Sequence, residues 1–239
     1  DASLAVARRD VKFPAEEVAA TRLAIIGMGK AGARELNYVS DVDVIFVGEA
    51  GGLDGESTLA DDRAVTIATQ LAMQTMRGIH DLATEPGLWE VDANLRPEGK
   101  DGALVRTLES HVAYYERWAK SWEFQALLKA RPLAGDLELG RQYVEAVSPK
   151  VWSSASRENF VDSVQRMRER VTDNIPADEL DVQLKLGPGG LRDVEFTIQL
   201  LQLVHGQSDP NVRQIATLPA LIALAEHGYI GRVEAAEFS

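Results

Sequence analysis

The sequence predicts an α+β fold in which a mixed sheet with helices is followed by a helical bundle. Three observations carry this prediction. Short apolar runs end at glycine or turn residues in the first part of the chain, and β-branched residues alternate there. From about residue 108 onward, apolar residues instead recur at helical spacing. We therefore predict two domains, an α/β core at residues 1–107 and a helical domain at 108–239 packed on it.

The first predicted strand covers residues 22–28, a short apolar run that ends at glycine. A second strand is predicted at 41–47, where β-branched residues partly alternate. Residues 48–56 contain four glycines and no periodic pattern, which indicates a loop. Apolar side chains then recur at helical spacing over residues 58–78, and the run ends at Gly78, as expected for a helix.

A third strand is predicted at residues 88–96, where apolar and polar side chains alternate. Pro97, Gly99 and Gly102 then predict a turn, after which residues 103–106 are expected to return as the hairpin partner of that strand. In the second half, Tyr114, Trp118, Trp122 and Leu127 share a helical spacing. Further helices are predicted around 136–147, 157–174, 191–205 and 217–227.

Composition and charge limit the classes of function. Hydrophobic residues make up 45% and charged residues 26% of the 239 residues, as in ordinary globular proteins. No apolar run approaches the roughly 18–20 residues that span a bilayer, so no membrane association is expected. The net charge of −12 repels polyanions, so nucleic acid is not an expected partner.

Cysteine usage and the first residue bear on the origin of the chain. Cysteine is absent, which excludes disulfides and thiolate nucleophiles and is compatible with a reducing, cytoplasmic location. The chain opens on Asp1 rather than methionine, so we expect it to be an excised fragment. A missing targeting segment then says little about the parent protein.

A glycine-rich segment matches half of a dinucleotide-binding fingerprint. Gly27, Gly29 and Gly32 have the G-x-G-x-x-G spacing after an apolar strand, and Glu49 lies about 20 residues on, where a ribose-binding acid is expected. However, only eight residues separate Gly32 from Asp41, whereas a βαβ crossover takes about 10–12 residues or more. We therefore interpret the glycines as a phosphate-side loop or as a tight turn that binds no ligand.

Two aspartates at the start of the second predicted strand are candidate metal ligands. Asp41 and Asp43 are two residues apart, so both side chains project from the same face of a strand. Asp92 lies on the polar face of the third predicted strand and joins them if the strands are neighbours. Three carboxylates suit hard divalent cations, and two Mg²⁺ ions could clamp the attacking and leaving oxygens of a phosphoryl transfer. The alternative is a solvated turn.

The same residues carry a family resemblance. Residues 27–46, which include the glycine loop, the run Glu35-Leu36-Asn37 and the two aspartates, closely resemble the nucleotidyltransferase motif of glutamine synthetase adenylyltransferases. Residues 89–99, 131–136 and 185–196 resemble later segments of that family, in the expected order. The resemblance implies a catalytic fold similar to that of DNA polymerase β.

The resemblance also implies a reaction and a set of site residues. Full-length members hold two nucleotidyltransferase domains, one that attaches AMP to a tyrosine of glutamine synthetase and one that removes it with phosphate, releasing ADP. The run Glu35-Leu36-Asn37 resembles the removing half. On this basis the two Mg²⁺ or Mn²⁺ ions would be bound by the catalytic carboxylates, and the nucleotide and phosphate by the glycine loop. The metal ligands expected are Asp41, Asp43 and Asp92, and the loop residues are Gly27, Gly29, Lys30, Gly32 and Ser40.

Cationic side chains are needed for phosphate, and three are candidates outside the loop. Arg96 shares the polar face of the third predicted strand with Asp92, although a structural salt bridge explains it equally well. Lys185 and Arg192 flank Gly187-Pro-Gly-Gly190 before a predicted helix, whose free N–H groups attract anions. The alternative for this segment is an ordinary loop in which Asp193 and Glu195 complement the helix start.

The expected partners are adenylylated glutamine synthetase, phosphate, and ADP or AMP, with a PII signalling protein acting through the full-length enzyme. Two other functions stay open. The same fold could transfer AMP from ATP to glutamine synthetase, or the chain could be a non-catalytic regulatory module that docks glutamine synthetase or a PII protein. Such a module has no need for three carboxylates.

Overall fold

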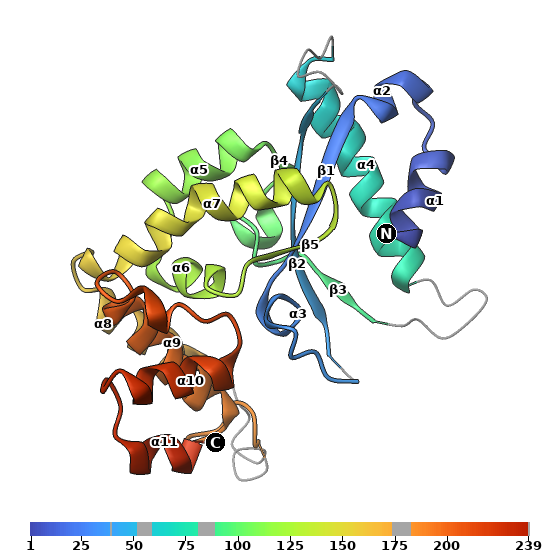
Figure 1. Cartoon of the computed structure of the whole chain (residues 1–239). Helices are drawn as coiled ribbons and strands as arrows, with labels where there is room; N and C mark the ends of the chain where they lie inside the picture. Colours follow the sequence, from blue (N-terminus) through green and yellow to red (C-terminus); the bar gives the residue numbers. More distant parts are fainter. Residues whose placement is uncertain (39, 52–58, 81–88, 174–182, 239) are drawn as a thin grey trace. The chain divides into compact units, whose positions relative to one another are not determined.

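The computed structural model describes residues 1–38, 40–51, 59–80, 89–173 and 183–238 (Figure 1). The chain divides into two compact units. The first contains Asp1–Ala119 and Lys129–Val147, and the second contains Lys120–Leu128 and Ser148–Ser239. This division differs from the predicted boundary at residues 107/108, because the helical segments on either side of residues 120–128 belong to the unit that holds the sheet.

The first unit is built on a five-stranded mixed sheet. Its strands are β1 (Thr21–Gly27), β2 (Val42–Ala50), β3 (Val91–Asp92), β4 (Val105–Arg106) and β5 (Arg131–Gly135). The order is β3-β2-β1-β5, and β4 also pairs with β2. Strand β1 is antiparallel to both β2 and β5, whereas β3 and β4 run parallel to β2.

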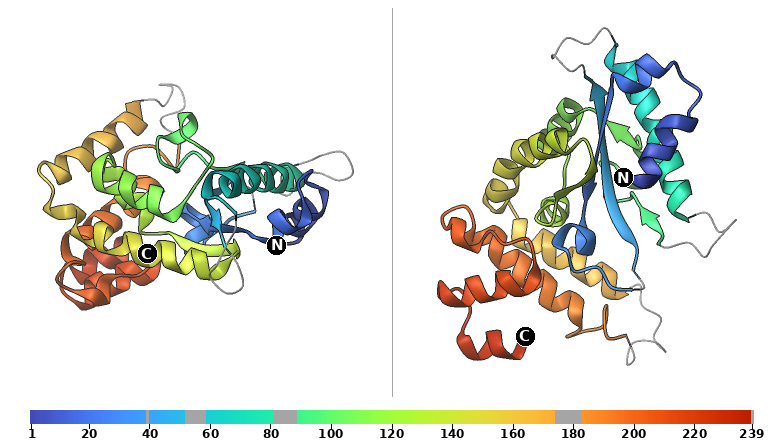
Figure 2. Two further views of the ribbon diagram at one scale, coloured as in Figure 1. Left: turned by 90° about the horizontal axis from the view of Figure 1, so that it is seen from above. Right: turned by 45° about the vertical axis from the view of Figure 1, so that its right-hand side comes forward.

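Three helices cover one face of this sheet: α1 (Ala2–Asp10), α2 (Ala15–Ala19) and α4 (Asp61–His80) (Figures 1 and 2). Ile67 and Leu71 of α4 are fully buried in the same apolar cluster as Phe46 of β2. Gly48 lets α4 approach closely, because a Cβ built there would lie 2.6 Å from Ala68 Cβ. The α4 helix therefore fixes β2, the strand that bears Asp43.

Two helices cover the opposite face: α5 (Leu108–Arg117) and the part of α7 (Leu137–Ser153) that belongs to the first unit (Figure 1). Tyr115 and Tyr143 are buried between them, and their hydroxyl groups are 2.9 Å apart. His111 lies beside both rings, with Nε2 3.3 Å from the Phe46 carbonyl oxygen. These contacts explain why both helices belong with the sheet.

Most predicted elements of the first unit are present, with changes in extent and pairing. The strand predicted at 41–47 continues to Ala50, because Gly48, Glu49 and Ala50 pair with residues of β1, so the loop prediction from 48 was wrong for these residues. Only Val91–Asp92 of the predicted strand 88–96 is a strand, and residue 88 lies outside the described residues. Residues 105–106 pair with β2 and not with β3, so the predicted hairpin was wrong. A one-turn 3₁₀ helix at Gly99–Asp101 lies between the two strands.

The second unit is helical. It contains α6 (Ser121–Leu127), the end of α7, α8 (Phe160–Asp173), α9 (Leu191–His205), α10 (Thr217–Glu226) and α11 (Arg232–Phe238), with 3₁₀ turns at Ser154–Ser156 and Pro210–Val212. The helices predicted at 157–174, 191–205 and 217–227 are confirmed to within a few residues. Ile198, Leu221 and Leu224 form the centre of an apolar cluster here. In the described part of the chain, no helix is long and apolar enough to cross a membrane.

Candidate active site

Asp43 and Asp92 are neighbours in the sheet. They are register partners on the parallel strands β2 and β3, one position after the pair Val42 and Val91. Both valines pack against the apolar cluster under α4, so the alternation of side chains directs the two carboxylates to the opposite face. Because neighbouring strands are about 4.8 Å apart, the two carboxylates can bind one ligand together. The condition set for Asp92, that its strand lies beside that of Asp43, is met.

Asp41 lies one residue before β2 and is exposed. The two-residue spacing to Asp43 holds, but residue 41 is outside the regular strand. Among the described residues, no group of three or more acidic or histidine side chains is gathered closely enough to hold a metal ion in this conformation. Oxygen donors from Asp43 and Asp92 nevertheless match the preference of hard divalent cations. The role of all three aspartates as metal ligands stays a prediction.

Gly29 lies directly against the Asp43 carboxylate. Its φ is +49°, and a Cβ built on it would lie 2.5 Å from Asp43 Oδ2. The backbone N–H of Met28 donates a hydrogen bond of 2.9 Å to the Asp43 carbonyl oxygen. The glycine loop and Asp43 thus form one local structure, in which a side chain at position 29 would displace the Asp43 carboxylate.

Gly29 also begins a one-turn helix, α3 (Gly29–Ala33). Gly32 is buried in it, and a Cβ at this position would collide with the Lys129 carbonyl oxygen. At Gly27 the same construction meets only ordinary contacts of 3.4 Å or more. Lys30 is half-buried on α3, and the Ser40 hydroxyl lies 3.4 Å from the Asp41 carbonyl oxygen. The glycines therefore shape the turn, and binding of phosphate by this loop stays a prediction.

The dinucleotide-binding alternative is excluded by strand direction. A βαβ crossover joins parallel strands, whereas β1 and β2 are antiparallel. Glu49 accepts a hydrogen bond of 3.0 Å from Arg22 at the other end of β2 from Asp43. Burial is the largest influence on its carboxyl and raises its pKa. Glu49 is therefore a partner in an ion pair that joins β1 to β2.

Arg96 organises the turn that follows β3. Its Nε, Nη1 and Nη2 atoms donate to the carbonyl oxygens of Gly102, Ala93 and Lys100 at 3.1, 2.8 and 3.0 Å. Burial lowers its pKa, against the opposing influence of Asp92. The Arg96 guanidinium thus binds backbone carbonyl oxygens and, among the described residues, does not form the structural salt bridge considered above. A further role in phosphate binding stays a prediction.

The backbone N–H groups at the start of α9 donate hydrogen bonds to carbonyl oxygens within the chain. The N–H groups of Leu191 and Arg192 donate to the carbonyl oxygens of Leu184 and Lys185, and those of residues 193 and 194 to that of Gly190. The Asp193 carboxylate accepts from Gly189 N at 2.7 Å and from Arg168 Nε at 2.8 Å. The Arg168 hydrogen bond is the main influence that lowers the Asp193 pKa.

These contacts change the basis of the predicted anion site around Lys185 and Arg192. The first four N–H groups of α9 are already paired, so the free donors that the prediction assumed are engaged within the chain. Asp193 complements the helix start, as the alternative explanation expected. Both cations belong to the second unit, and their part in phosphate binding stays a prediction that rests on their side chains alone.

Arg131 is a contact of the glycine loop that the sequence did not single out. Its Nε donates to the Gly32 carbonyl oxygen at 2.8 Å, and its Nη2 donates to that of Ala31 at 2.9 Å. Only the pairing of β5 with β1 brings it to α3, so no local signal indicates the contact.

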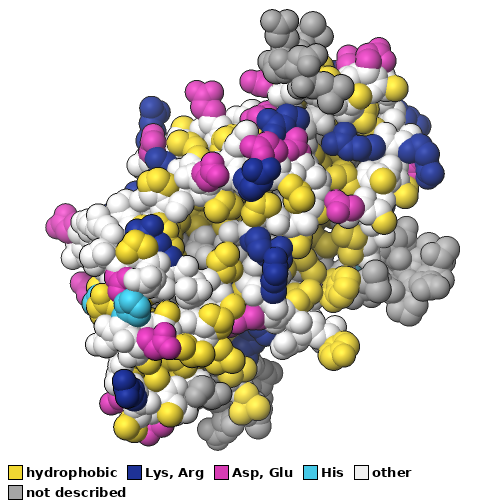
Figure 3. Space-filling model, in the orientation of Figure 1, with side chains coloured by type: hydrophobic (Ala, Val, Ile, Leu, Met, Phe, Trp, Pro, Cys, Tyr) yellow, Lys and Arg dark blue, Asp and Glu magenta, His cyan; other side chains and the backbone are white. Residues whose placement is uncertain are grey.

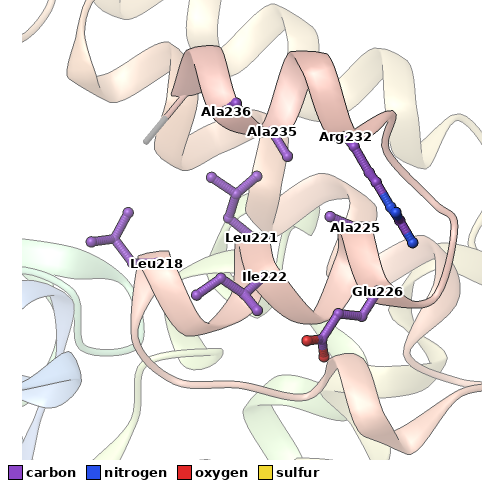
Figure 4. A pocket seen from close by; sticks show the side chains of 8 residues that line it. All are labelled: Leu218, Leu221, Ile222, Ala225, Glu226, Arg232, Ala235 and Ala236. Carbon is purple, nitrogen blue, oxygen red and sulfur yellow. The ribbon is translucent and has the colours of Figure 1, made fainter.

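Away from this site, the described surface is mixed in charge and the second unit contains a cavity. On the face drawn in Figure 3, basic and acidic side chains are interspersed. A cavity of about 490 Å³ lies between α10 and α11 in the second unit (Figure 4). Apolar side chains from both helices line it, and Glu226 and Arg232 are the charged residues at its wall.

Comparison with known proteins places these features in a family context. Residues 2–146 match the family model described as Glutamate-ammonia ligase adenylyltransferase, and residues 158–239 match that described as GlnD PII-uridylyltransferase. The two matches cover the sheet-bearing part of the chain and most of its helical part, respectively.

Individual relatives are similar along nearly the whole chain. A protein of Leifsonia xyli named bifunctional glutamine synthetase adenylyltransferase/adenylyl-removing enzyme is 71% identical over 100% of this chain and 24% of its own length. Proteins of the same name from Streptomyces coelicolor and Mycobacterium tuberculosis are 61% and 54% identical. They cover 93% and 100% of this chain and 22% of their own length in each case. The chain thus spans less than a quarter of these relatives.

Proposed function

The chain belongs to the glutamate-ammonia ligase adenylyltransferase family of nucleotidyltransferases, and from this premise we propose that it removes AMP from adenylylated glutamine synthetase by phosphorolysis. The names of the relatives support the substrate, because they combine adenylyl transfer to glutamine synthetase with adenylyl removal. The reaction would take place in the cytoplasm, and a PII signalling protein would act through the longer enzyme.

In the proposed reaction, a phosphate oxygen attacks the α-phosphorus of the AMP group on tyrosine. A bond forms between that oxygen and phosphorus, and the bond from phosphorus to the tyrosine oxygen breaks. The products are ADP and the tyrosine side chain, whose oxygen takes up a proton because the phenol pKa is about 10. Such transfers depend mainly on positioning and charge neutralisation.

The arrangement of Asp43 and Asp92 is the observation that carries the proposal. Their carboxylates emerge side by side from neighbouring strands, on the face that is not covered by α4. Gly29 holds the backbone of the glycine loop against Asp43. A module that only docks a partner has no need for this pair, so the arrangement favours catalysis.

The chemistry of these donors fits Mg²⁺ or Mn²⁺. We propose that Asp43 and Asp92, together with Asp41, would hold two such ions. Bound ions would neutralise charge on the transferring phosphoryl group. The protein's own part is to fix the two strand carboxylates in register and to keep the loop against them.

Residues 35–37 and the nature of the nucleophile support removal over addition. The run Glu35-Leu36-Asn37 resembles the adenylyl-removing half of the family. An attacking phosphate already carries a charged oxygen, so it does not need a strong general base. His111 is buried beside Tyr115 and Tyr143, where it serves the core.

Phosphate needs cationic or N–H donors, and we propose that the loop supplies the first of them. Gly27, Gly29 and Gly32 set the backbone there, and Lys30 carries the positive charge on α3. Ser40 precedes Asp41 on the way into β2. Arg96, Lys185 and Arg192 are the further candidates. The Arg96 guanidinium also donates to three backbone carbonyl oxygens around the turn after β3.

The experiment is to incubate adenylylated glutamine synthetase with this chain, phosphate and Mg²⁺, and to identify the nucleotide released. We expect ADP that depends on phosphate and is lost with Asp43→Asn, while Asp10→Asn, an exposed aspartate on α1, keeps the activity. AMP transfer from ATP to unmodified glutamine synthetase, with no ADP released, would assign the opposite direction. Binding of glutamine synthetase without either reaction would favour the docking module.

A further inference from the structure

The C-terminal end of α3 is bound by a side chain that lies about 100 residues away in the sequence. Arg131 of β5 donates to two successive carbonyl oxygens, those of Ala31 and Gly32, at 2.9 and 2.8 Å. The guanidinium presents its donors as a planar fork, which matches two such acceptors. A lysine has no such fork, so the contact depends on arginine and not only on positive charge.

The α3 helix needs an external anchor. It has five residues, far fewer than the roughly 12–15 at which an isolated helix becomes even marginally stable. Its end is closed by a left-handed residue, Arg34, with a φ of +62°, and by the Glu35 N–H, which donates to the Lys30 carbonyl oxygen at 2.8 Å, whereas the Arg34 N–H reaches the Ala31 carbonyl oxygen only at 3.4 Å. The carbonyl end of a helix carries partial negative charge, so a cation there is favourable. Arg131 therefore completes α3.

The start of α3 is the part that touches the candidate catalytic carboxylate. Gly29, its first residue, lies against Asp43 Oδ2, so a shift of α3 changes the space around that oxygen. Lys129, two residues before β5, contributes a second restraint. The backbone carbonyl of Lys129 packs on Gly32, and the buried Lys129 Nζ donates to Glu35 Oε2 at 3.2 Å.

From these contacts we infer that Arg131 is a positioning residue, which holds α3 so that Gly29 fixes the Asp43 carboxylate beside Asp92. The inference rests on the proposed function, because it assigns Arg131 a part in preparing that metal and phosphate site. Arg131 does not itself touch substrate in this account. It acts through the two carbonyl groups of α3 and through Gly29.

The test compares Arg131→Lys with a matched control, Arg22→Lys. Arg22 lies at the other end of β1 and makes an equivalent forked contact with Asp136, through Nε at 2.7 Å and Nη2 at 3.3 Å. Mn²⁺ affinity is measured by calorimetry and unfolding by thermal melting for the 239-residue chain. Loss of a residue that orients metal ligands costs about 10–100-fold in metal affinity. We expect such a loss for Arg131→Lys and unchanged Mn²⁺ affinity for Arg22→Lys.

Unchanged Mn²⁺ affinity in Arg131→Lys, with a melting temperature lowered as in Arg22→Lys, would overturn the inference and leave Arg131 a purely structural residue. Absence of Mn²⁺ binding by the unsubstituted chain would instead contradict the metal site of the proposed function. Hydrogen exchange of the 27–35 segment decides the inference in that event. Faster exchange of this segment in Arg131→Lys, but not in Arg22→Lys, supports the inference that Arg131 holds α3. Exchange equal to that of the unsubstituted chain contradicts the inference.

Discussion

At position 29, a methyl group and the Asp43 carboxylate would occupy the same space. Gly228 provides a comparison, since its φ of +79° is also left-handed but a Cβ there would meet nothing within 4 Å. Alanine at either position costs about 1–2 kcal/mol of backbone strain. The two glycines therefore separate the effect of backbone strain from the effect of displacing a carboxylate.

We expect both Gly29→Ala and Gly228→Ala to be destabilised in urea unfolding, and Gly29→Ala by more, because overpacking adds to its backbone strain. Only Gly29→Ala should weaken Mn²⁺ binding, by about tenfold or more, because it moves a metal ligand. Calorimetry of both variants checks this. Equal Mn²⁺ affinity in the two variants would mean that the loop does not define the position of Asp43.

His111 makes the stability of the first unit sensitive to acid. Burial is the largest influence on its imidazole and lowers its pKa to about 4, despite the contact with the Phe46 carbonyl. Because the folded-state pKa lies below the unfolded value of about 6.5, the folded state favours neutral histidine. This stabilising contribution is complete above pH 6.5 and is lost as the pH falls toward 4.

The matched variant is His111→Gln, which does not titrate. We expect the stability of the unsubstituted chain, measured relative to this variant by urea unfolding, to fall by about 1 kcal/mol between pH 7.5 and 5.5. The comparison cancels the titration of other groups that the two chains share. A difference that stays constant with pH would contradict the account of a buried, neutral His111.

The side of the strand on which Asp43 lies could be predicted from the sequence, because the information about it is local. Spacing of two residues and alternation on a strand place Asp43 on the opposite side from Val42 and Val44, and the structure confirms this division. Arg131 was not predicted as a contact of the loop, since its partners Ala31 and Gly32 come from a distant segment. Long-range pairing of β5 with β1 creates that contact.

Gly48 on β2 and Gly78 on α4 have opposite roles. A Cβ at Gly48 would lie 2.6 Å from Ala68 Cβ and 2.7 Å from Val105 Cγ1, so the helix and strand are too close for a side chain. Gly78 lies in the last part of α4, where a Cβ would meet only Ser3, at 3.8 Å or more.

We expect Gly48→Ala to lower the free energy of unfolding by about 1–3 kcal/mol through overpacking. Gly78→Ala should raise it by roughly 0.5–1 kcal/mol, because alanine is the better helix former. Chemical denaturation of the two variants measures both values. Stabilisation by Gly48→Ala would show that α4 does not pack tightly on β2.

Elements with a long periodic pattern were predicted from the sequence. Elements whose extent and pairing depend on tertiary contacts were not. The helices α4, α8, α9 and α10 follow from their apolar spacing. The strand predicted at 88–96 shortens to two residues because Asp92 Oδ1 accepts from Asn94 N at 2.6 Å and Arg96 binds the carbonyls of the turn. Alternation indicates a strand, but it does not identify the strand with which it pairs.

For the whole chain, the family matches follow the structural division more closely than the predicted boundary does. The first match ends at residue 146 and the second begins at residue 158, whereas the first unit ends at Val147. The prediction at 107/108 followed the change from mixed to helical patterning. Helix α5 and the first part of α7 come after residue 107 but belong to the first unit. Their apolar side chains complete the core on one face of the sheet.

The net charge of −12 gives the carboxylate pair its significance at the scale of the molecule. An acidic protein repels phosphate on average, so an anionic substrate must be held by local cations. Divalent ions between Asp43 and Asp92 would neutralise that repulsion where the reaction occurs. The proposed reaction therefore depends on metal binding by these two residues.

Mn²⁺ titration of the unsubstituted chain, Asp43→Asn, Asp92→Asn and the exposed control Asp10→Asn tests this claim most directly. We expect saturable binding by the unsubstituted chain and by Asp10→Asn, and affinity at least about tenfold weaker for each strand variant, because each removes a ligand. Binding that is the same in all four proteins would contradict the account, since the metal would then be held elsewhere than between β2 and β3.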